Sequence, residues 1–352
     1  MNIEKNKGII FLAVVLLIFT LTGCFEAKNS YEWVLEAEYD KIYDFKDGKA
    51  CVEKGEERWM IHSDGTLTEI DMDRDYDYLK YTITKTKSVG SDNQELYGIE
   101  NLLGETILEK KYEYISYSSN ESIVAIESES EPRFMFFNPE GILVAELDKR
   151  DDPKVMFAFV RPFSDGYAAF HENFRCGFLN NKGEVAIEAQ YMEVGDFKNG
   201  YATVVKGVPT DVHGINEYRW GLIDPSGNYI IDCEYTYLGD YSDGLIAFSD
   251  GGAVGYMTID GDTIIQPQYA NASNFTDGTA YVIPKSFLSF IKMPVWDLNQ
   301  VGAPYYLIDK DNNRLWTFRK EKGFGFIDKQ DNFIYVLSIP NEKIGLIKNP
   351  VL

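Results

Sequence analysis

The most regular feature of this chain is a short pattern of apolar and turn-forming positions that recurs along most of its length. Two positions six residues apart occur together eight times, and the second is always Gly, Asn or Asp. The pairs are Trp59 and Gly65, Gly98 and Gly104, Met135 and Gly141, Gly177 and Gly183, Gly221 and Gly227, Gly255 and Gly261, Tyr306 and Asn312, and Gly325 and Asp331. Because these residue types tolerate a left-handed backbone, each pair predicts a tight turn between two short apolar strands.

Two further positions keep a fixed distance from this turn in the clearest copies. A Tyr follows the turn residue by eight positions, at Tyr112, Tyr191, Tyr235 and Tyr269. Six residues later comes an aromatic-x-[Asp/Asn]-Gly step, at Phe197 to Gly200, Tyr241 to Gly244 and Phe275 to Gly278, and the same step occurs at Phe45 to Gly48 and at Phe163 to Gly166. An apolar run follows each step, so a unit of roughly 35 to 45 residues predicts three or four short strands.

The repeat predicts an all-β chain, because nothing after residue 23 shows a sustained helical period of apolar residues. Two architectures suit such units: a closed β-propeller, or an open β-solenoid of β-hairpin repeats. The chain starts in the middle of a unit, with Tyr39 and the step from Phe45 to Gly48, and finishes with the first half of one, Gly325 to Asp328. Complementary halves complete one blade from both ends, so we expect a closed propeller of about seven blades.

Residues 220–244 resemble the bacterial WG β-repeat family. Units of that family read Trp-Gly-[Phe/Leu]-Ile-Asp-x-x-Gly, followed by a Tyr and a Phe-x-[Asp/Glu]-Gly-x-Ala step. Here W-G-L-I-D-P-S-G runs from Trp220 to Gly227, followed by Tyr235 and by Y-S-D-G from Tyr241 to Gly244. The resemblance extends over about residues 31–335. It implies a repeat architecture and a surface or secreted protein, and it carries no catalytic set of residues.

The first 23 residues are typical of a sorting signal. Lys5 and Lys7 give a basic start, and the uncharged stretch from Gly8 to Thr22 is shorter than the roughly 20 residues that span a bilayer. The following Leu21-Thr22-Gly23-Cys24 resembles the bacterial lipobox, which implies that Cys24 receives a diacylglycerol. We therefore expect a signal peptide at 1–23, a lipidated Cys with a short tether at 24–30, and an extracytoplasmic, lipid-anchored repeat domain at 31–352. An uncleaved membrane anchor is the alternative.

The net charge limits which partners the protein can bind, and the cysteine content limits which disulfide or metal sites it can form. The formal net charge is −22, which repels nucleic acid and anionic lipid, so we expect no nucleic-acid partner. Apart from Cys24 the chain has Cys51, Cys176 and Cys233, an odd number without metal-ligand spacing. We interpret all three as buried small apolar side chains, with Cys176 and Cys233 in strands.

One acidic run suggests a cation site. Asp71, Asp73, Asp75 and Asp77 alternate along the chain, which in a strand would align four carboxylates on one face. An EF-hand loop would need Gly and Glu where Tyr76 and Thr82 stand. We interpret the run as a solvated strand edge, and a weak cation site is the alternative.

Nothing in the sequence matches a catalytic motif. The chain has only three histidines, His62, His171 and His213, and none stands in a known catalytic pattern. The carboxylates that precede Gly in the repeat, such as Asp165, Asp243 and Asp277, are expected to accept hydrogen bonds from local backbone in turns. We therefore expect no enzyme activity, no cofactor and no metal.

Two insertions interrupt the repeat and are the best candidates for binding a partner, because binding residues concentrate on loops of rigid scaffolds. The first, residues 207–218, contains His213. The second, residues 284–304, is apolar and contains Phe287, Phe290 and Trp296. These four residues are candidate partner-binding residues. The alternative is that the second insertion packs onto the ring as a lid or plug.

These observations favour a non-catalytic binding or scaffold module, held at the outer face of the membrane by its N-terminal lipid, with an envelope protein or glycan as partner. An envelope glycan hydrolase that uses paired carboxylates is one alternative. A substrate-binding lipoprotein that feeds a transporter is another; it fits the anchor but not the fold, because nothing here alternates strand with helix.

Overall fold

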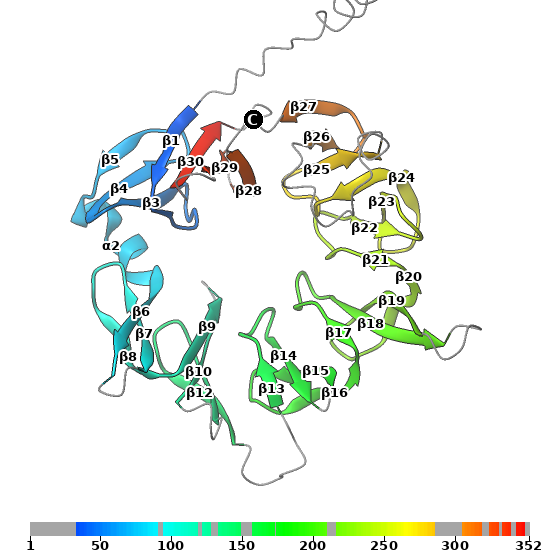
Figure 1. The fold of residues 1–352 in the computed structure, drawn as a ribbon, viewed down its shortest axis with the longest axis horizontal. Coiled ribbons are helices and arrows are strands. Elements are labelled where there is room, and N and C mark those ends of the chain that lie inside the picture. The colour runs from blue at the N-terminus through cyan, green and yellow to red at the C-terminus, as the bar shows by residue number, and fades with distance from the viewer. Residues whose placement is uncertain are drawn as a thin grey trace, which may run out of the picture.

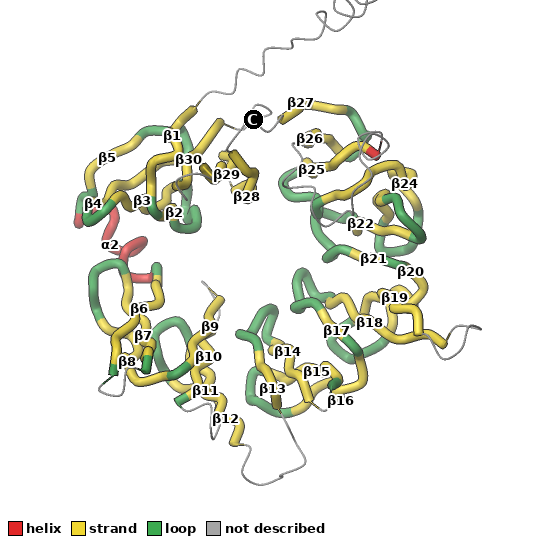
Figure 2. Tube along the Cα trace, viewed as in Figure 1, coloured by secondary structure: helices red, strands yellow, loops and turns green. Residues whose placement is uncertain are grey.

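The protein is a ring of small antiparallel sheets (Figure 1). The computed structural model describes residues 33–90, 94–118, 122–127, 133–148, 157–172, 174–209, 216–285, 305–318, 324–330, 333–338 and 343–348. Almost all regular structure in these residues is strand, and α2 (Met72–Tyr81) lies between two sheets (Figure 2). Each sheet of three or four strands is called a blade, numbered from the N-terminus.

The first three blades follow one another along the chain. Blade 1 consists of β2 (Lys41–Ile42), β3 (Lys49–Lys54), β4 (Glu57–His62) and β5 (Leu67–Glu69). Blade 2 consists of β6 (Ile83–Val89), β7 (Glu95–Asn101) and β8 (Thr106–Tyr112). Blade 3 consists of β9 (Tyr114–Ser118), β10 (Ser122–Ile126), β11 (Arg133–Phe137) and β12 (Leu143–Asp148). Among the described strands, blade 2 therefore has one strand fewer than its neighbours.

The next blades repeat the four-stranded order. Blade 4 consists of β13 (Phe157–Val160), β14 (Tyr167–Glu172), β15 (Arg175–Asn180) and β16 (Val185–Tyr191). Blade 5 consists of β17 (Glu193–Val194), β18 (Ala202–Pro209), β19 (Asn216–Ile223) and β20 (Tyr229–Tyr235). In blades 3 and 5 the first strand lies nearest the centre of the ring and the fourth lies farthest out (Figure 1).

Blades 6 and 7 share a strand. Their seven-stranded sheet contains β21 (Tyr237–Leu238), β22 (Ile246–Ser249), β23 (Val254–Met257), β24 (Thr263–Ala272), β25 (Thr279–Pro284), β26 (Tyr305–Asp309) and β27 (Arg314–Phe318). The first part of β24 pairs with β23, through Tyr256 and Ile265, and its end pairs with β25, through Ala272 and Val282. β24 is thus the fourth strand of blade 6 and the first strand of blade 7. The described strands form seven sheets and eight blades.

The last blade joins both ends of the domain. It is ordered β28 (Phe324–Gln330), β29 (Phe333–Ser338), β30 (Lys343–Lys348) and β1 (Trp33–Tyr39), with Tyr39 opposite Ile344. Leu35 and Tyr39 of β1 share an apolar cluster with Leu346 and with Ile61 of blade 1. The predicted closed propeller is confirmed and the open solenoid is wrong, and the described strands form eight blades rather than the expected seven or so. The last repeat unit is divided differently from the prediction, because Gly325 lies in the first strand of this blade rather than in its third. Asp331 is outside the described residues.

The recurring Gly of the third strand is explained by contact with the fourth strand. A Cβ atom on Gly177 would stand 2.4 Å from the carbonyl oxygen of Ile187, and one on Gly255 would stand 2.4 Å from that of Ile265. The residue before each Gly faces the predicted Tyr across the ladder, as Trp220 faces Tyr235, and the register shifts just beyond that pair. The Trp-Gly motif therefore marks the point where the fourth strand bulges toward the third.

The aromatic-x-[Asp/Asn]-Gly steps are turns between the first and second strands of a blade. Both residues of the pair have positive φ, for example 52° at Asp47 and 73° at Gly48, as a type I′ turn requires. The turn aromatics couple neighbouring blades: the Phe197 ring of blade 5 lies 4.7 Å from the Phe178 ring of blade 4. The left-handed positions predicted from the six-residue pairs are confirmed separately, because every described one has positive φ: Gly65, Gly104, Gly141, Gly183, Gly227, Gly261 and Asn312.

The turn carboxylates reach the next blade. Asp165 accepts a hydrogen bond from the amide of Gly200 at 2.9 Å, and Asp243 accepts one from Gly278 at 2.6 Å. In both cases the donor lies 35 residues later, in the equivalent turn of the following blade. Local backbone partners were predicted from the sequence. Because successive turns stack around the ring, these hydrogen bonds instead join neighbouring blades.

The acidic run at residues 71–77 is the start of α2 and not a strand, so the predicted strand edge is wrong. Asp71 caps the helix by accepting from the amide of Asp73 at 2.9 Å. Asp75, Tyr78 and Leu79 form the buried face, at the i, i+3, i+4 spacing of a helix. The alternating Asp residues obscured that spacing, which covers only ten residues.

The three cysteines of the described residues are free thiols. Cys51 is buried and free, whereas Cys176 and Cys233 are free and half-buried, in β15 and β20 as expected for strands. Burial raises the pKa of the Cys51 thiol to about 12, so it is an inert apolar side chain at neutral pH. No helix in the described part of the chain is long and apolar enough to span a membrane.

Candidate functional site

The candidate residues predicted from the sequence lie outside the described residues. These are Cys24, His213, Phe287, Phe290 and Trp296. The structure shows only the borders of the two insertions. β18 and β19 continue as a paired hairpin to Pro209 and Asn216, and β25 ends at Pro284. Within the described residues, the strongest candidate for a functional site is a different part of the chain.

That feature is the break in the repeat at blade 2. Between β5 and β6 the chain forms α2, where blades 4, 5 and 6 place a short first strand and an [Asp/Asn]-Gly turn. The sheet of blade 2 accordingly runs β6-β7-β8, without a described strand inside β6. α2 therefore stands in for the first strand of this blade in the order of the chain, and it lies between blades 1 and 2 (Figure 1).

A buried carboxylate fixes α2 to blade 1. Asp75 is fully buried, and its oxygens lie 3.0 Å from the Lys49 ammonium of β3 and 2.8 Å from the Arg74 guanidinium. The amide of Asp71 also donates to Asp75 at 3.0 Å. Burial alone would raise the pKa of Asp75, but these donors outweigh burial and hold the pKa well below its usual range. The carboxylate is thus partnered by protein cations, and no group of metal ligands is found among the described residues.

A tyrosine hydroxyl makes the second attachment of α2. Tyr78 donates to the carbonyl oxygen of Asp44 at 2.9 Å and accepts from the amide of Cys51 at 3.1 Å. Tyr78 and Leu79 pack in one apolar cluster with Cys51, Met60 and Leu102, which joins blade 1, α2 and blade 2. Asp75 and Tyr78 therefore hold the helix rigidly, so that its C-terminal end has a defined position.

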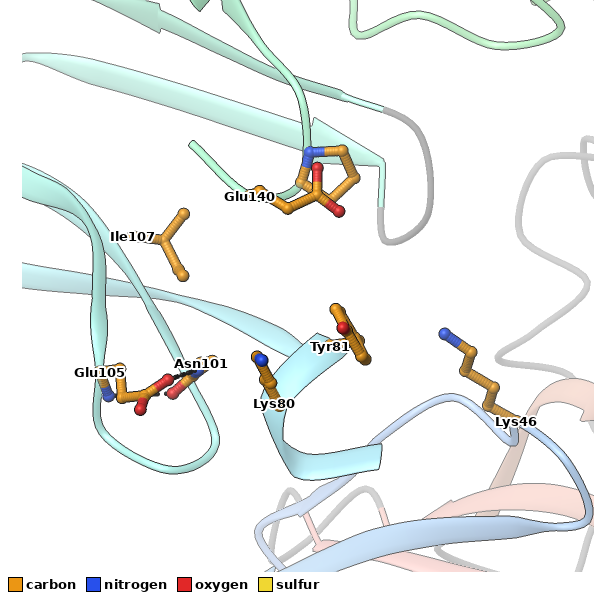
Figure 3. Close-up of a pocket in the computed structure, with 8 residues that line it drawn as sticks. Lys46, Lys80, Tyr81, Asn101, Glu105, Ile107 and Glu140 are labelled. Atoms are coloured by element: carbon orange, nitrogen blue, oxygen red, sulfur yellow. Dashed lines mark hydrogen bonds between the residues drawn. The ribbon is translucent and has the colours of Figure 1, made fainter. Parts of the chain in front are cut away.

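Two cavities meet at that C-terminal end. The first, of about 300 Å³, is lined by Lys46, Lys80, Tyr81, Asn101, Glu105, Ile107, Pro139 and Glu140 (Figure 3). The second, of about 450 Å³, is lined by Lys41, Ile42, Tyr43, Asp44, Phe45, Lys46, Tyr81, Thr82, Ile83 and Tyr117. Lys46 and Tyr81 line both. The two cavities together are called the α2 groove, and blades 1, 2 and 3 all contribute to it.

Lysines and tyrosines are paired in the α2 groove. The ammonium groups of Lys46 and Lys80 lie 5.7 and 5.5 Å from the centre of the Tyr81 ring, within the range of a cation–π contact. Figure 3 shows Tyr81 between the two lysines. Lys41 lies 4.1 Å above the Tyr43 ring and donates to Thr84 Oγ1 at 3.0 Å. This arrangement places three ammonium groups beside flat ring surface, in a lining that also contains Asp44, Glu105 and Glu140.

Burial shifts the pKa of two groups in the second cavity. Desolvation lowers the pKa of Lys41, opposed in part by the negative charge of Glu53. Desolvation raises the pKa of Tyr117, opposed in part by a hydrogen bond from the Lys85 backbone. A neutral tyrosine hydroxyl and a partly desolvated ammonium favour an anionic ligand, because the anion restores the solvation that the ammonium loses.

The first cavity also contains carboxylates. Glu105 and Glu140 both line it, and Glu105 accepts from the side-chain amide of Asn101 at 2.7 Å (Figure 3). None of these residues was predicted from the sequence. A partial signal was present, because the unit between Glu69 and Ile83 lacks the aromatic-x-[Asp/Asn]-Gly step found in blades 1, 4, 5, 6 and 7, although the unit of blade 3 lacks it as well.

A closed ring of antiparallel blades, completed by strands from both ends, defines the protein as a β-propeller. The family model of the WG containing repeat matches residues 32–57, 177–207, 220–252 and 255–283. The predicted WG repeat is thereby confirmed at these four stretches. No curated protein matches the sequence of the chain.

Several solved structures share features of the fold. BamB from Moraxella catarrhalis is 9% identical, with 87% of this chain and 90% of that chain covered and a TM-score of 0.42. The Neurospora crassa Pan2 WD40 domain is 11% identical, with 89% and 90% covered and a TM-score of 0.35. A structure described as the eukaryotic initiation factor is 9% identical, with 82% and 89% covered and a TM-score of 0.44. Likenesses at this level do not bear on function.

Proposed function

We propose that this protein is a lipid-anchored, non-catalytic binding module of the bacterial cell envelope, and that the α2 groove is its binding site. The lipobox-like Leu21 to Cys24 and the WG repeats support the location and the scaffold role. The observation that carries the binding site is the break in the repeat at blade 2, where lysines and tyrosines from blade 1, α2 and blade 3 surround two cavities.

The ligand chemistry follows from the lining of the groove. Lys41, Lys46 and Lys80 supply ammonium groups, and Tyr43 and Tyr81 supply flat ring surface beside them. Such a surface binds a partner that presents carboxylates next to apolar or ring-shaped groups. An envelope protein or a glycan with acidic substituents has this chemistry. Exposed ion pairs weaken with salt, so binding is expected to weaken as ionic strength rises.

Charge reversal in the groove tests the proposal. The full chain, purified in detergent, is sedimented with envelope fragments from cells that lack it. Lys46→Glu combined with Lys80→Glu should lower the apparent affinity at least about tenfold, because two attractive contacts become repulsive. Lys182→Glu, an exposed lysine in a turn of blade 4, is the matched control and should bind as the parent does. Equal affinity of all three proteins would rule out the α2 groove as the binding site.

The lipid anchor has its own test. Cys24→Ala removes the thiol that the lipobox resemblance assigns to lipidation, so the variant should keep its first 23 residues and carry no lipid. The mass of the protein purified from cells shows whether the first 23 residues are retained and whether a lipid is attached. A variant that is cleaved and fractionates like the parent would contradict the anchor.

A glycan hydrolase is the second candidate, because Glu105 and Glu140 face the same cavity. Paired carboxylates on either side of a glycosidic bond are the usual machinery of such enzymes. The full chain is incubated with cell-wall fragments, and released sugars are measured. We expect no release. Release that is abolished by Glu105→Gln or by Glu140→Gln alone would establish the hydrolase and overturn the binding module.

A further inference from the structure

β6 is built differently from the second strands of the other blades. The strands β3, β10, β14, β18, β22 and β25 each bury a continuous run of at least three side chains. β6 buries only Ile83, and its remaining side chains alternate between half-buried and exposed. Its sequence is Ile-Thr-Lys-Thr-Lys-Ser-Val, far more polar than the apolar runs at the equivalent positions. The side chains of Lys85, Lys87 and Val89 on one face of β6 are therefore exposed, and no described strand occupies the side where the other blades have a first strand.

The backbone of β6 presents hydrogen-bonding groups to that vacant side. Gly90 donates to Gln94, and Leu102 donates to Thr82, so the even-numbered residues of this ladder bond to β7. In an antiparallel pair, the intervening residues point their N–H and C=O groups the other way. For β6 these are Ile83, Lys85, Lys87 and Val89, and no described strand pairs with that edge.

The second cavity of the α2 groove begins at this edge. It is lined by Ile83 of β6, by Lys41 and Ile42 of the first strand of blade 1, and by Tyr117 of the first strand of blade 3. Tyr117 accepts a hydrogen bond from the Lys85 backbone, so one side chain caps one of the outward-facing amides. The Thr86 hydroxyl is buried without a hydrogen-bond partner in the described part of the chain. Blade 2 therefore has three described strands and lies between two blades that have four.

We infer that β6 accepts an extended acidic peptide segment of a partner protein, which pairs with its open edge in the place of the missing first strand of blade 2. This inference rests on the proposed function of the α2 groove and adds to it the class of partner and the mode of binding. Addition of a strand to an open sheet edge is a recurrent mode of peptide recognition.

The charged side chains near the open edge of β6 indicate which kind of partner can pair with it. Lys85 projects from β6, and Lys41 and Lys46 line the adjoining cavity, against a single aspartate, Asp44, in its lining, whereas Lys87 is paired with Glu95 at 2.8 Å. Lysines on an exposed edge disfavour pairing with a second copy of the same strand, because like charges would face each other. The same lysines favour a strand with carboxylates at alternate positions. An acidic peptide therefore fits where a second copy of this chain does not.

The probe is a fluorescein-labelled, acetylated and amidated hexapeptide of alternating Glu and Thr, which spans about 20 Å when extended. Its binding to the full chain in detergent is measured by fluorescence anisotropy. Two isomers carry N-methyl groups on either the three Glu nitrogens or the three Thr nitrogens, with charge unchanged. Only one edge of an added strand faces β6. One isomer should therefore lose at least about tenfold in affinity while the other keeps the parent value.

Two variants of β6 separate backbone pairing from charge. Lys85→Pro removes an outward-facing amide and leaves the ladder to β7 intact, so it should weaken binding at least about tenfold, whereas Lys85→Thr removes only the charge and should cost about two- to threefold. Tyr117→Phe frees the Lys85 amide from its internal acceptor and should tighten binding several-fold. Circular dichroism and the urea midpoint confirm that each variant is folded.

The outcomes distinguish the inference from the proposed function. Peptide binding that is equally affected by both methylated isomers, and unchanged by Lys85→Pro and Tyr117→Phe, would overturn strand addition and leave an anion-binding groove. Absence of peptide binding, together with retention on envelope glycan that depends on Lys46 and Lys80, would also overturn the peptide as partner. Loss of every form of binding to the groove would remove the proposed function itself.

Discussion

At the scale of the residue, Asp75 connects the fold to the site, because its ion pairs hold α2 where Tyr81 and Lys80 line the groove. Asp75→Asn removes the charge that Lys49 and Arg74 neutralise, and it should lower the free energy of unfolding by about 2 kcal/mol at pH 7. The pKa of Asp75 is depressed in the folded state, so its contribution is present above the unfolded pKa of about 3.9 and is lost as pH falls below it.

Urea unfolding of parent and variant at pH 7 and near pH 3 measures this prediction. The difference between the two proteins should be full at pH 7 and smaller at pH 3. Asp77→Asn is the control, because it makes the same charge change at an exposed position of the same helix. A difference that is absent at pH 7, or that does not shrink in acid, would contradict the role of the Asp75 ion pairs.

Single residues were predictable where a local backbone rule decided them. The turn glycines, Asn312, and the Asp-Gly pairs follow from their tolerance of positive φ, and each described member has the predicted conformation. The partners of Asp165 and Asp243 were not predictable, because they lie 35 residues away and depend on how successive blades stack. Sequence spacing specifies a turn, but it does not specify what the turn contacts.

At the scale of the element, the turn-to-turn hydrogen bonds are expected to couple neighbouring blades. Asp165→Gly removes the acceptor for Gly200 while keeping a residue that tolerates the positive φ of 48°, so the loss reports the bond. We expect a decrease of about 1 kcal/mol in the free energy of unfolding, measured by urea titration. Asp165→Asn keeps an oxygen acceptor and should stay close to the parent. Equal effects of Gly and Asn would show that the contact does not stabilise the ring.

Strands were predictable as elements, and the helix was not. The offsets between Gly, Tyr and the aromatic-Asp-Gly step repeat often enough to outline most strands. α2 is ten residues long and its buried face is only Asp75, Tyr78 and Leu79, so its apolar period is too short and too polar to be recognised. The expected step is absent before Ile83, at the place of the groove, but it is also absent before Ser122 of blade 3, so its absence alone did not identify the site.

At the scale of the whole molecule, closure through β1 and β30 makes every blade depend on its neighbours. Deletion of blade 5, residues 193–235, should collapse the domain, because the faces of blades 4 and 6 would lose their partners and the ring could not close. Loss of cooperative thermal unfolding and rapid proteolysis are the expected results. A deletion variant that melts as cooperatively as the parent would contradict a closed ring.

The architecture was largely predictable from the sequence, and the site was not. Complementary half-units at the two ends pointed to closure, which the pairing of β1 with β30 confirms. The α2 groove brings together Lys46, Tyr81 and Glu140 from three separate parts of the chain, so only the arrangement in space reveals it. The residues predicted to bind a partner, in the insertions at 207–218 and 284–304, lie outside the described residues and stay predictions.

The most direct test of the central claim is photo-crosslinking in living cells at three positions. A crosslinking amino acid replaces Tyr81 in the α2 groove, Trp296 in the second insertion, or Tyr218 at the first insertion. Tyr81 and Tyr218 are matched exposed tyrosines, 46% and 58% accessible. We predict one dominant adduct from Tyr81 and none from Tyr218. Adducts from Trp296 or Tyr218 with none from Tyr81, in a folded protein, would place the partner on an insertion and contradict the α2 groove.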